Sequence, residues 1–170
     1  FPDGKRLATL SRARPEGEPL RIFEVEGWKE VPHSIPNGSR IHLALAADGK
    51  KVALTAGRRM EVWDLQTSKK LHEFQCRERV MGRAEAVALS PDGVYLAGGF
   101  MRNSEGVDPG ERTPLLRVWD LRTEKEVLQG WTEDSHCEAV AFSPDGRLLA
   151  AGGEGEKGPV QIWELASGKM

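Results

Sequence analysis

The run Asp134, Ser135, His136 and Cys137 contains the side-chain types of a hydrolase or a metal site. A nucleophilic serine or cysteine needs a histidine base, and an acid orients that base. Adjacent residues of an extended segment point to opposite sides, however, and a triad is assembled across space rather than along four neighbours. No glycine-flanked nucleophile accompanies the run. We therefore expect an exposed loop here, and we predict that the chain is not an enzyme.

Histidine and cysteine residues elsewhere form no recognisable site. The further histidines share no metal-binding spacing: His33, His42 and His72. Cys76 and Cys137 lack the Cys-x-x-Cys spacing that holds zinc or carries out redox chemistry. Each precedes the first strand of a different repeat, so we expect no disulfide between them. We predict no metal ion, no cofactor, and no set of acids and histidines that converges on one point.

The elements that would have to position any site are four copies of one motif. Each copy opens with a turn of the Pro-Asp-Gly type, and the turn aspartates are Asp3, Asp48, Asp92 and Asp145. Four residues after each aspartate stands an aliphatic residue, followed directly by alanine. Proline in the second place and glycine in the fourth place of Ser-Pro-Asp-Gly favour a type I turn between two strands.

A second repeated position carries an aromatic residue flanked by aliphatic residues. These aromatic residues are Phe23, Trp63, Trp119 and Trp163. A lysine stands six residues after each of them, in or just after a short turn. The spacings between successive aromatic residues are 40, 56 and 44, which is about the period of a four-stranded propeller blade.

These motifs resemble the WD-repeat family of β-propellers over essentially the whole chain. Trp-Asp itself stands at 63–64 and 119–120, Trp163-Glu164 is a close variant, and Phe23-Glu24 is a distant one. The resemblance implies an all-β fold of four consecutive antiparallel blades, each with strands a to d. It also implies a protein-interaction scaffold with protein partners.

Strands of alternating large and small apolar residues agree with this architecture. We expect one propeller domain over 1–170, with repeats at about 1–40, 41–84, 85–137 and 138–170. The first copy lacks strand a and the last lacks strand d, so the expected order is bcd, abcd, abcd, abc. We therefore expect a partial ring from a longer, bacterial-type WD-repeat protein of about six to eight blades. Its open edges would make the isolated piece prone to self-association.

The connections between strands b and c, and between d and a, share one face of a propeller. We predict that this face binds the partner, because connections that vary between repeats carry recognition. The candidate residues are Arg12, Arg14, Arg58, Arg59, Arg102, Asn103, Glu105, Asp108, Arg112, Glu133, Asp134 and Glu154. The longest connection, Phe100–Pro114, reads as an exposed loop, which either takes part in recognition or simply tolerates an insertion.

Charge is distributed unevenly over these connections, because basic residues dominate in the first half of the chain and acidic residues in the second. This bipolar face either steers a partner of complementary charge or is ordinary solvated surface. The formal net charge of −2 argues against a nucleic-acid partner. Trp28 and Trp131 lie outside the aromatic column, and they either anchor a partner or pack between blades.

Two classes of function remain open. The favoured one is a non-catalytic scaffold in the cytoplasm, without nucleic-acid or membrane partners. The alternative is a sensor or regulatory propeller attached to an enzyme such as a signalling kinase or ATPase, or a propeller enzyme whose site lies in further blades.

Overall fold

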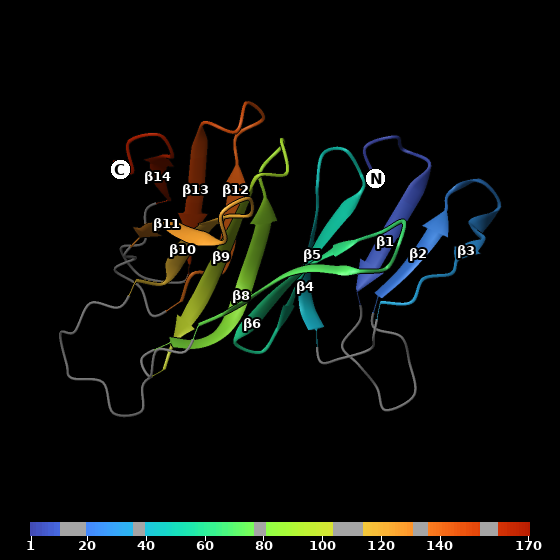
Figure 1. The fold of residues 1–170 in the computed structure, drawn as a ribbon, viewed down its shortest axis with the longest axis horizontal. Coiled ribbons are helices and arrows are strands. Elements are labelled where there is room, and N and C mark those ends of the chain that lie inside the picture. The colour runs from blue at the N-terminus through green and yellow to red at the C-terminus, as the bar shows by residue number, and fades with distance from the viewer. Residues whose placement is uncertain (11–19, 36–39, 77–80, 104–113, 131–135, 154–159) are drawn as a thin grey trace.

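The structure is a computed structural model that describes residues 1–10, 20–35, 40–76, 81–103, 114–130, 136–153 and 160–170. Within these residues the chain forms fourteen strands in four antiparallel sheets. The sheets follow one another along the long axis of the molecule, with the first and the fourth at opposite ends (Figure 1). Apart from a single 3-10 turn, η1 (Glu26–Trp28), they contain no helix, and so none that could cross a membrane.

Each sheet is a meander in which consecutive strands are neighbours. The first sheet has three strands, β1 (Arg6–Leu10), β2 (Leu20–Glu24) and β3 (Glu30–Val31). The second has β4 (Arg40–Leu45), β5 (Lys51–Ala56), β6 (Arg59–Asp64) and β7 (Lys70–Gln75). The third has β8 (Met81–Leu89), β9 (Tyr95–Arg102), β10 (Leu116–Asp120) and β11 (Lys125–Gly130). The fourth has β12 (Ala139–Phe142), β13 (Leu148–Gly152) and β14 (Gln161–Glu164).

This arrangement confirms the predicted fold class. In the described residues the first and fourth sheets have three strands and the two middle sheets have four, as the order bcd, abcd, abcd, abc requires. The four sheets are blades of a partial β-propeller that does not close into a ring.

The repeated Ser-Pro-Asp-Gly segment joins the first two strands of a blade. The Gly93 amide donates to the Ser90 carbonyl at 2.8 Å, as a type I turn requires. The Ser90 Oγ then accepts from the Tyr95 amide at 2.8 Å, at the start of β9. Gly93 has a φ of +66°, a backbone conformation that strains residues with a side chain. The serine and the glycine of the motif are therefore explained by the turn itself.

The acidic residue after the aromatic column fixes the turn between strands c and d. The Asp64 carboxylate accepts hydrogen bonds from the Thr67 amide at 2.7 Å and from its hydroxyl at 2.8 Å. Asp120 accepts from the Arg122 amide at 2.8 Å and from the Arg122 guanidinium at 2.7 Å. Glu164, which replaces aspartate in the last copy, accepts from the Ser167 hydroxyl at 2.6 Å. These acids therefore have a structural role.

Asp120 gives the chain a predictable sensitivity to acid. The hydrogen bond from the Arg122 side chain is the main cause that lowers the pKa of the Asp120 carboxyl from 3.8 to about 2. Because the folded-state pKa is depressed, the carboxylate stabilises the fold fully above about pH 4, and this contribution is lost as the pH falls towards 2. We expect Asp120→Asn to lower Tm at neutral pH, and the gap to wild type to shrink below about pH 4. Thermal melts followed by circular dichroism would measure this, and a constant gap would contradict it.

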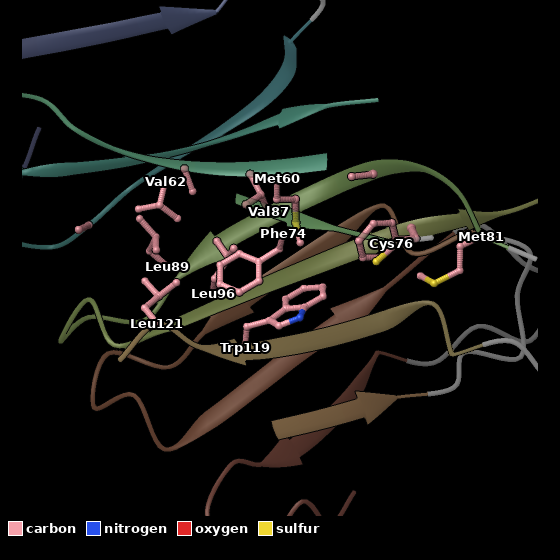
Figure 2. Close-up of a cluster of buried hydrophobic side chains, with 14 residues drawn as sticks. Met60, Val62, Phe74, Cys76, Met81, Val87, Leu89, Leu96, Trp119 and Leu121 are labelled. Carbon is pink, nitrogen blue, oxygen red and sulfur yellow. The ribbon is translucent and has the colours of Figure 1, made fainter. Parts of the chain in front are cut away.

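Three buried apolar clusters hold the blades together, one at each boundary between neighbouring sheets. Trp63 packs at the boundary between the first and second sheets, Trp119 between the second and third, and Trp163 between the third and fourth. Figure 2 shows the middle cluster, in which Met60 and Phe74 of the second sheet meet Trp119 of the third. The repeated aromatic residue is therefore the residue with which each blade packs against the preceding one.

The two outer sheets leave apolar side chains uncovered. Val62 and Val118 precede the tryptophan in β6 and β10 and are fully buried, whereas Ile162, at the same position in β14, is 51% exposed. On the opposite face, Leu149 is fully buried, whereas its counterpart in the first sheet, Leu7, is 41% exposed. The faces that bind neighbours in the middle sheets are thus open at both ends of the row.

Two expectations about connections were wrong in part. Phe100, Met101 and Arg102 belong to strand β9, and Phe100 is fully buried, so the long connection begins later than composition indicated. Its residues 104–113 lie outside the described part of the chain. His136 forms a β-bridge with Met101, and Cys137 is fully buried, so this end of the polar run 134–137 is not an exposed loop. Residues 134 and 135 lie outside the described part.

Other side chains singled out in the sequence can also be placed. Cys76 and Cys137 are both buried and lie in different apolar clusters, so they do not pair with each other, as expected. Trp28 is 66% exposed and does not pack between blades. Trp131 lies outside the described residues.

Candidate functional site

The connections after strands b and d meet at one end of the sheets. The Ala84 amide in β8 donates to the carbonyl of Gly57, in the β5–β6 turn, at 2.8 Å. The backbone carbonyl of Arg58, in the same turn, accepts a hydrogen bond from the amide of Cys76, directly after β7, at 3.2 Å. Backbone hydrogen bonds therefore tie the b–c turn of the second sheet to the start of the third sheet. We call this end, with its b–c and d–a connections, the connection face.

Four of the predicted partner-binding residues lie on the described part of the connection face. Arg58 and Arg59 form the β5–β6 turn and the start of β6, and Arg102 and Asn103 end β9 and follow it. The Arg59 side chain is about half exposed and lies 3.8 Å from the Glu73 carboxylate. The other candidates lie outside the described residues: Arg12, Arg14, Glu105, Asp108, Arg112, Glu133, Asp134 and Glu154.

Near this end, the structure brings together three metal-ligating side chains that the sequence analysis did not group. Glu85 comes from β8, and His136 and Glu138 come from the segment that precedes β12. One ligand atom from each lies within 4.8 Å of the other two. His136 Nδ1 lies 3.1 Å from Glu85 Oε2, which joins the third sheet to the fourth. We call these three residues the Glu-His-Glu group.

A β-bulge places Glu85 in this group. In the pairing of β8 with β9, Ala84 lies opposite Phe100 and Ala86 opposite Gly99, so Glu85 is the extra residue between two successive pairs. An extra residue of this kind bends the strand and re-aims its side chain. Glu85 consequently escapes the strict alternation of β8, and its side chain reaches the histidine of the next sheet.

Gly99 in β9 and Gly153 directly after β13 let the segment with the other two ligands lie close to the sheets. A Cβ atom on Gly99 would lie 2.4 Å from the Cys137 carbonyl oxygen, and one on Gly153 would lie 1.8 Å from that of His136. The segment can lie this close only because both positions are glycine. Its backbone is also held by hydrogen bonds from Cys137 to Phe100 at 3.0 Å and from Glu138 to Gly152 at 2.9 Å.

Alternation along this segment separates the polar side chains from the thiol. His136 and Glu138 join the same group, whereas Cys137 between them packs into the apolar cluster with Leu149 and Trp163. Burial is the main cause that raises the pKa of the Cys137 thiol to about 12, and the nearby Glu138 and Glu85 charges add to it. A thiol in this state remains protonated at neutral pH, which argues against a nucleophilic role.

An arginine balances the buried acid of the group. The Arg83 guanidinium donates from Nε and from a terminal nitrogen to Glu85 Oε1, both at 3.1 Å. The Glu85 side chain is only 11% exposed, so an unpaired charge there would be costly. Arg83 and His136 thus hold one carboxylate oxygen each.

A hollow of about 390 Å³ opens beside the Glu-His-Glu group. Its walls come from the first strand of each of the four sheets and from Glu138, directly before β12. The lining residues are Leu10, His42, Leu43, Glu85, Ala86, Val87, Glu138, Ala139 and Val140. Two acids of the group therefore face a space that a small solute can enter.

No family model matches the chain. Comparison with curated proteins finds several relatives. The chain is 42% identical over 53 residues to a Periodic tryptophan protein 2 homolog of Dictyostelium discoideum, a match that covers 31% of the chain and 6% of that protein. It is 27% identical over 173 residues to a Protein LST8 homolog of Drosophila melanogaster, covering 98% of the chain and 48% of that protein. The chain spans less than half the length of these curated relatives.

Among solved structures, the chain resembles a chain of Kuenenia stuttgartiensis hydrazine synthase. The TM-score is 0.75 at 20% identity, and the match covers 99% of this chain and 45% of that one. This likeness concerns the fold alone. The two sequence relatives are WD-repeat proteins. With the repeated turn and tryptophan columns and the four blade-like sheets, these relatives show that the chain is similar to WD-repeat β-propeller proteins.

Proposed function

We propose that the chain is a non-catalytic scaffold that binds a protein partner through its connection face. WD-repeat relatives support a protein-interaction role in general. The observation that carries the proposal is that the side chains repeated in every copy have structural roles. Trp63, Trp119 and Trp163 pack between blades, and Asp64 and Asp120 fix turns. The variable positions of the connection face remain for recognition.

The two adjacent arginines of the β5–β6 turn provide a direct test of this surface. We expect the double variant Arg58→Glu/Arg59→Glu to slow partner association by about tenfold at low salt, because charge at an interface steers encounter. Its association rate should also depend less on ionic strength. Affinity capture with the full-length protein would supply the partner, and surface plasmon resonance at several salt concentrations would measure the rates.

A matched control exists in the same sheet. Lys50 and Lys69 are exposed and lie near each other at the opposite end of the sheet, where Leu65 and Asp64 donate backbone bonds to their carbonyls. Lys50→Glu/Lys69→Glu makes the same change in charge and should leave association unchanged. Equal slowing by both double variants would point to net charge alone, and no slowing by either would remove the connection face from the proposal.

The alternative function, a regulatory propeller attached to an enzyme, makes a different prediction. In that case the connection face contacts a catalytic domain of the same polypeptide, and cross-links from this face in the full-length protein would be intramolecular. Under the scaffold proposal they join two different proteins. For either function, the proposed compartment is the cytoplasm, where the thiols of Cys76 and Cys137 would stay reduced.

We also propose that the chain is one propeller unit whose outer sheets contact further blades. The half-exposed Ile162 and Leu7 support this, because their counterparts in the middle sheets are fully buried by neighbouring blades. Where these faces stay uncovered, two copies of the chain can associate through them.

A further inference from the structure

We propose that Glu85, His136 and Glu138 bind a divalent transition-metal ion that clamps the third blade to the fourth. The scaffold function does not require this site. The three side chains offer one imidazole nitrogen and two carboxylates, from two different blades. An ion held by them would link Glu85 of β8 to the segment that precedes β12.

Distances in the group agree with ligands that share one ion. Bonds from zinc to imidazole nitrogen and carboxylate oxygen are about 2.0–2.2 Å. Two ligands on one ion then lie about 3.0–3.5 Å apart, from octahedral to tetrahedral geometry. His136 Nδ1 and Glu85 Oε2 are already 3.1 Å apart. The ligand atom of Glu138 lies within 4.8 Å of both of these atoms.

Supporting contacts hold the ligands in place before an ion arrives. The bulge aims Glu85, and the close contacts with Gly99 and Gly153 fix the backbone of the other two ligands. Arg83 holds Glu85 Oε1, and Oε2, which contacts His136 Nδ1 in the absence of an ion, is the oxygen that would bind the ion. Ligating carboxylates in metal sites are commonly oriented by hydrogen bonds of this kind.

The ligand set selects the class of ion. Imidazole suits zinc, iron, nickel and copper, whereas calcium and magnesium prefer oxygen ligands throughout. The thiol of Cys137 packs into the apolar cluster and does not join the set. Three protein ligands leave at least one position on the ion open. That position would be supplied from the hollow that Glu85 and Glu138 line.

Zinc binding to the chelator-treated full chain tests the proposal. We expect isothermal titration calorimetry at neutral pH to give one zinc ion per chain. Loss of an outer-shell partner already weakens metal binding by about 10–100-fold, so His136→Gln and Glu138→Gln should each weaken it by about tenfold or more. At the same zinc concentration, zinc should also raise the Tm of the wild-type chain more than that of either variant.

A second histidine–glutamate pair, His72 and Glu124, provides the matched control. His72 Nδ1 lies 2.9 Å from Glu124 Oε1 and also joins two sheets, but in the described residues it belongs to no group of three ligands. His72→Gln should therefore bind zinc like the wild type. Glu138 is exposed, so Glu138→Gln should keep the wild-type Tm in chelator, which separates loss of the site from loss of the fold. Zinc binding of equal affinity in the wild type, His136→Gln and Glu138→Gln would overturn the proposal, and so would no binding by the wild type.

Discussion

Replacing Trp119 by alanine should lower the free energy of unfolding by about 3–5 kcal/mol, the usual cost of removing a buried aromatic side chain. Trp119 is almost fully buried between the second and third blades. Its ring centroid lies 5.3 Å from that of Phe74 and 6.4 Å from that of Phe100, with the Phe100 ring edge-on. The variant loses these ring contacts and leaves a cavity at the boundary between two blades (Figure 2).

Trp28 provides the comparison within the same chain. It is exposed, so Trp28→Ala should change the free energy of unfolding by less than about 0.5 kcal/mol. Urea unfolding followed by far-UV circular dichroism suits both variants, because the signal comes mainly from the backbone of the strands. A loss of stability for Trp119→Ala no larger than for Trp28→Ala would show that the aromatic column does not hold the blades together.

The fold could be predicted because its signals are local. The Ser90 and Gly93 turn depends on residues that are neighbours in sequence, and so does the turn held by Asp120. Each of these signals is weak alone, but each recurs at the same position in all four copies, which makes the prediction of the fold secure. The missing strands at both ends also followed from counting elements along the chain, which requires no knowledge of contacts between blades.

Composition did not predict the end of strand β9 correctly, because the glycines in that strand have a packing role. Gly98 and Gly99 precede Phe100, which the composition predicts as the start of a loop. In the structure a Cβ on Gly98 would lie 2.4 Å from the Met60 sulfur, and one on Gly99 equally close to the Cys137 carbonyl. These glycines stand inside β9 because the neighbouring blades approach it closely on both sides. Such an approach is a tertiary feature, which local glycine content does not reveal.

The Glu-His-Glu group was missed for a related reason. Glu85 and His136 are separated by 51 positions. Glu85 and Glu138 hold the same position in the third and fourth copies, seven residues before the turn aspartate, but His136 belongs to no repeated column. Their meeting depends on a bulge in β8 and on how two blades pack. One sequence signal was available, because His136 and Glu138 alternate on an extended segment and thus share a side. That signal gave two ligands but not the third.

Val118, the residue before Trp119, is a second position where a substitution should strongly lower the free energy of unfolding. Val118 is fully buried at the boundary between the third and fourth blades. Val118→Asp would place an unpaired carboxylate in this apolar cluster, where protonation or local opening must relieve the charge. We expect the free energy of unfolding to fall by about 3 kcal/mol or more, since both the apolar packing and the desolvation of the acid count against the fold.

Ile162 holds the same position in the fourth blade, yet half of its side chain is exposed. In the 170-residue chain, Ile162→Asp should therefore change the free energy of unfolding by less than about 0.5 kcal/mol. The same substitution should reduce self-association, measured by analytical ultracentrifugation, because it charges an open apolar face. In a protein where a further blade covers this face, Ile162→Asp should become as costly as Val118→Asp. If Ile162→Asp stayed harmless there while Val118→Asp was costly, no blade would pack on Ile162, and the proposed continuation of the ring on this side would be wrong.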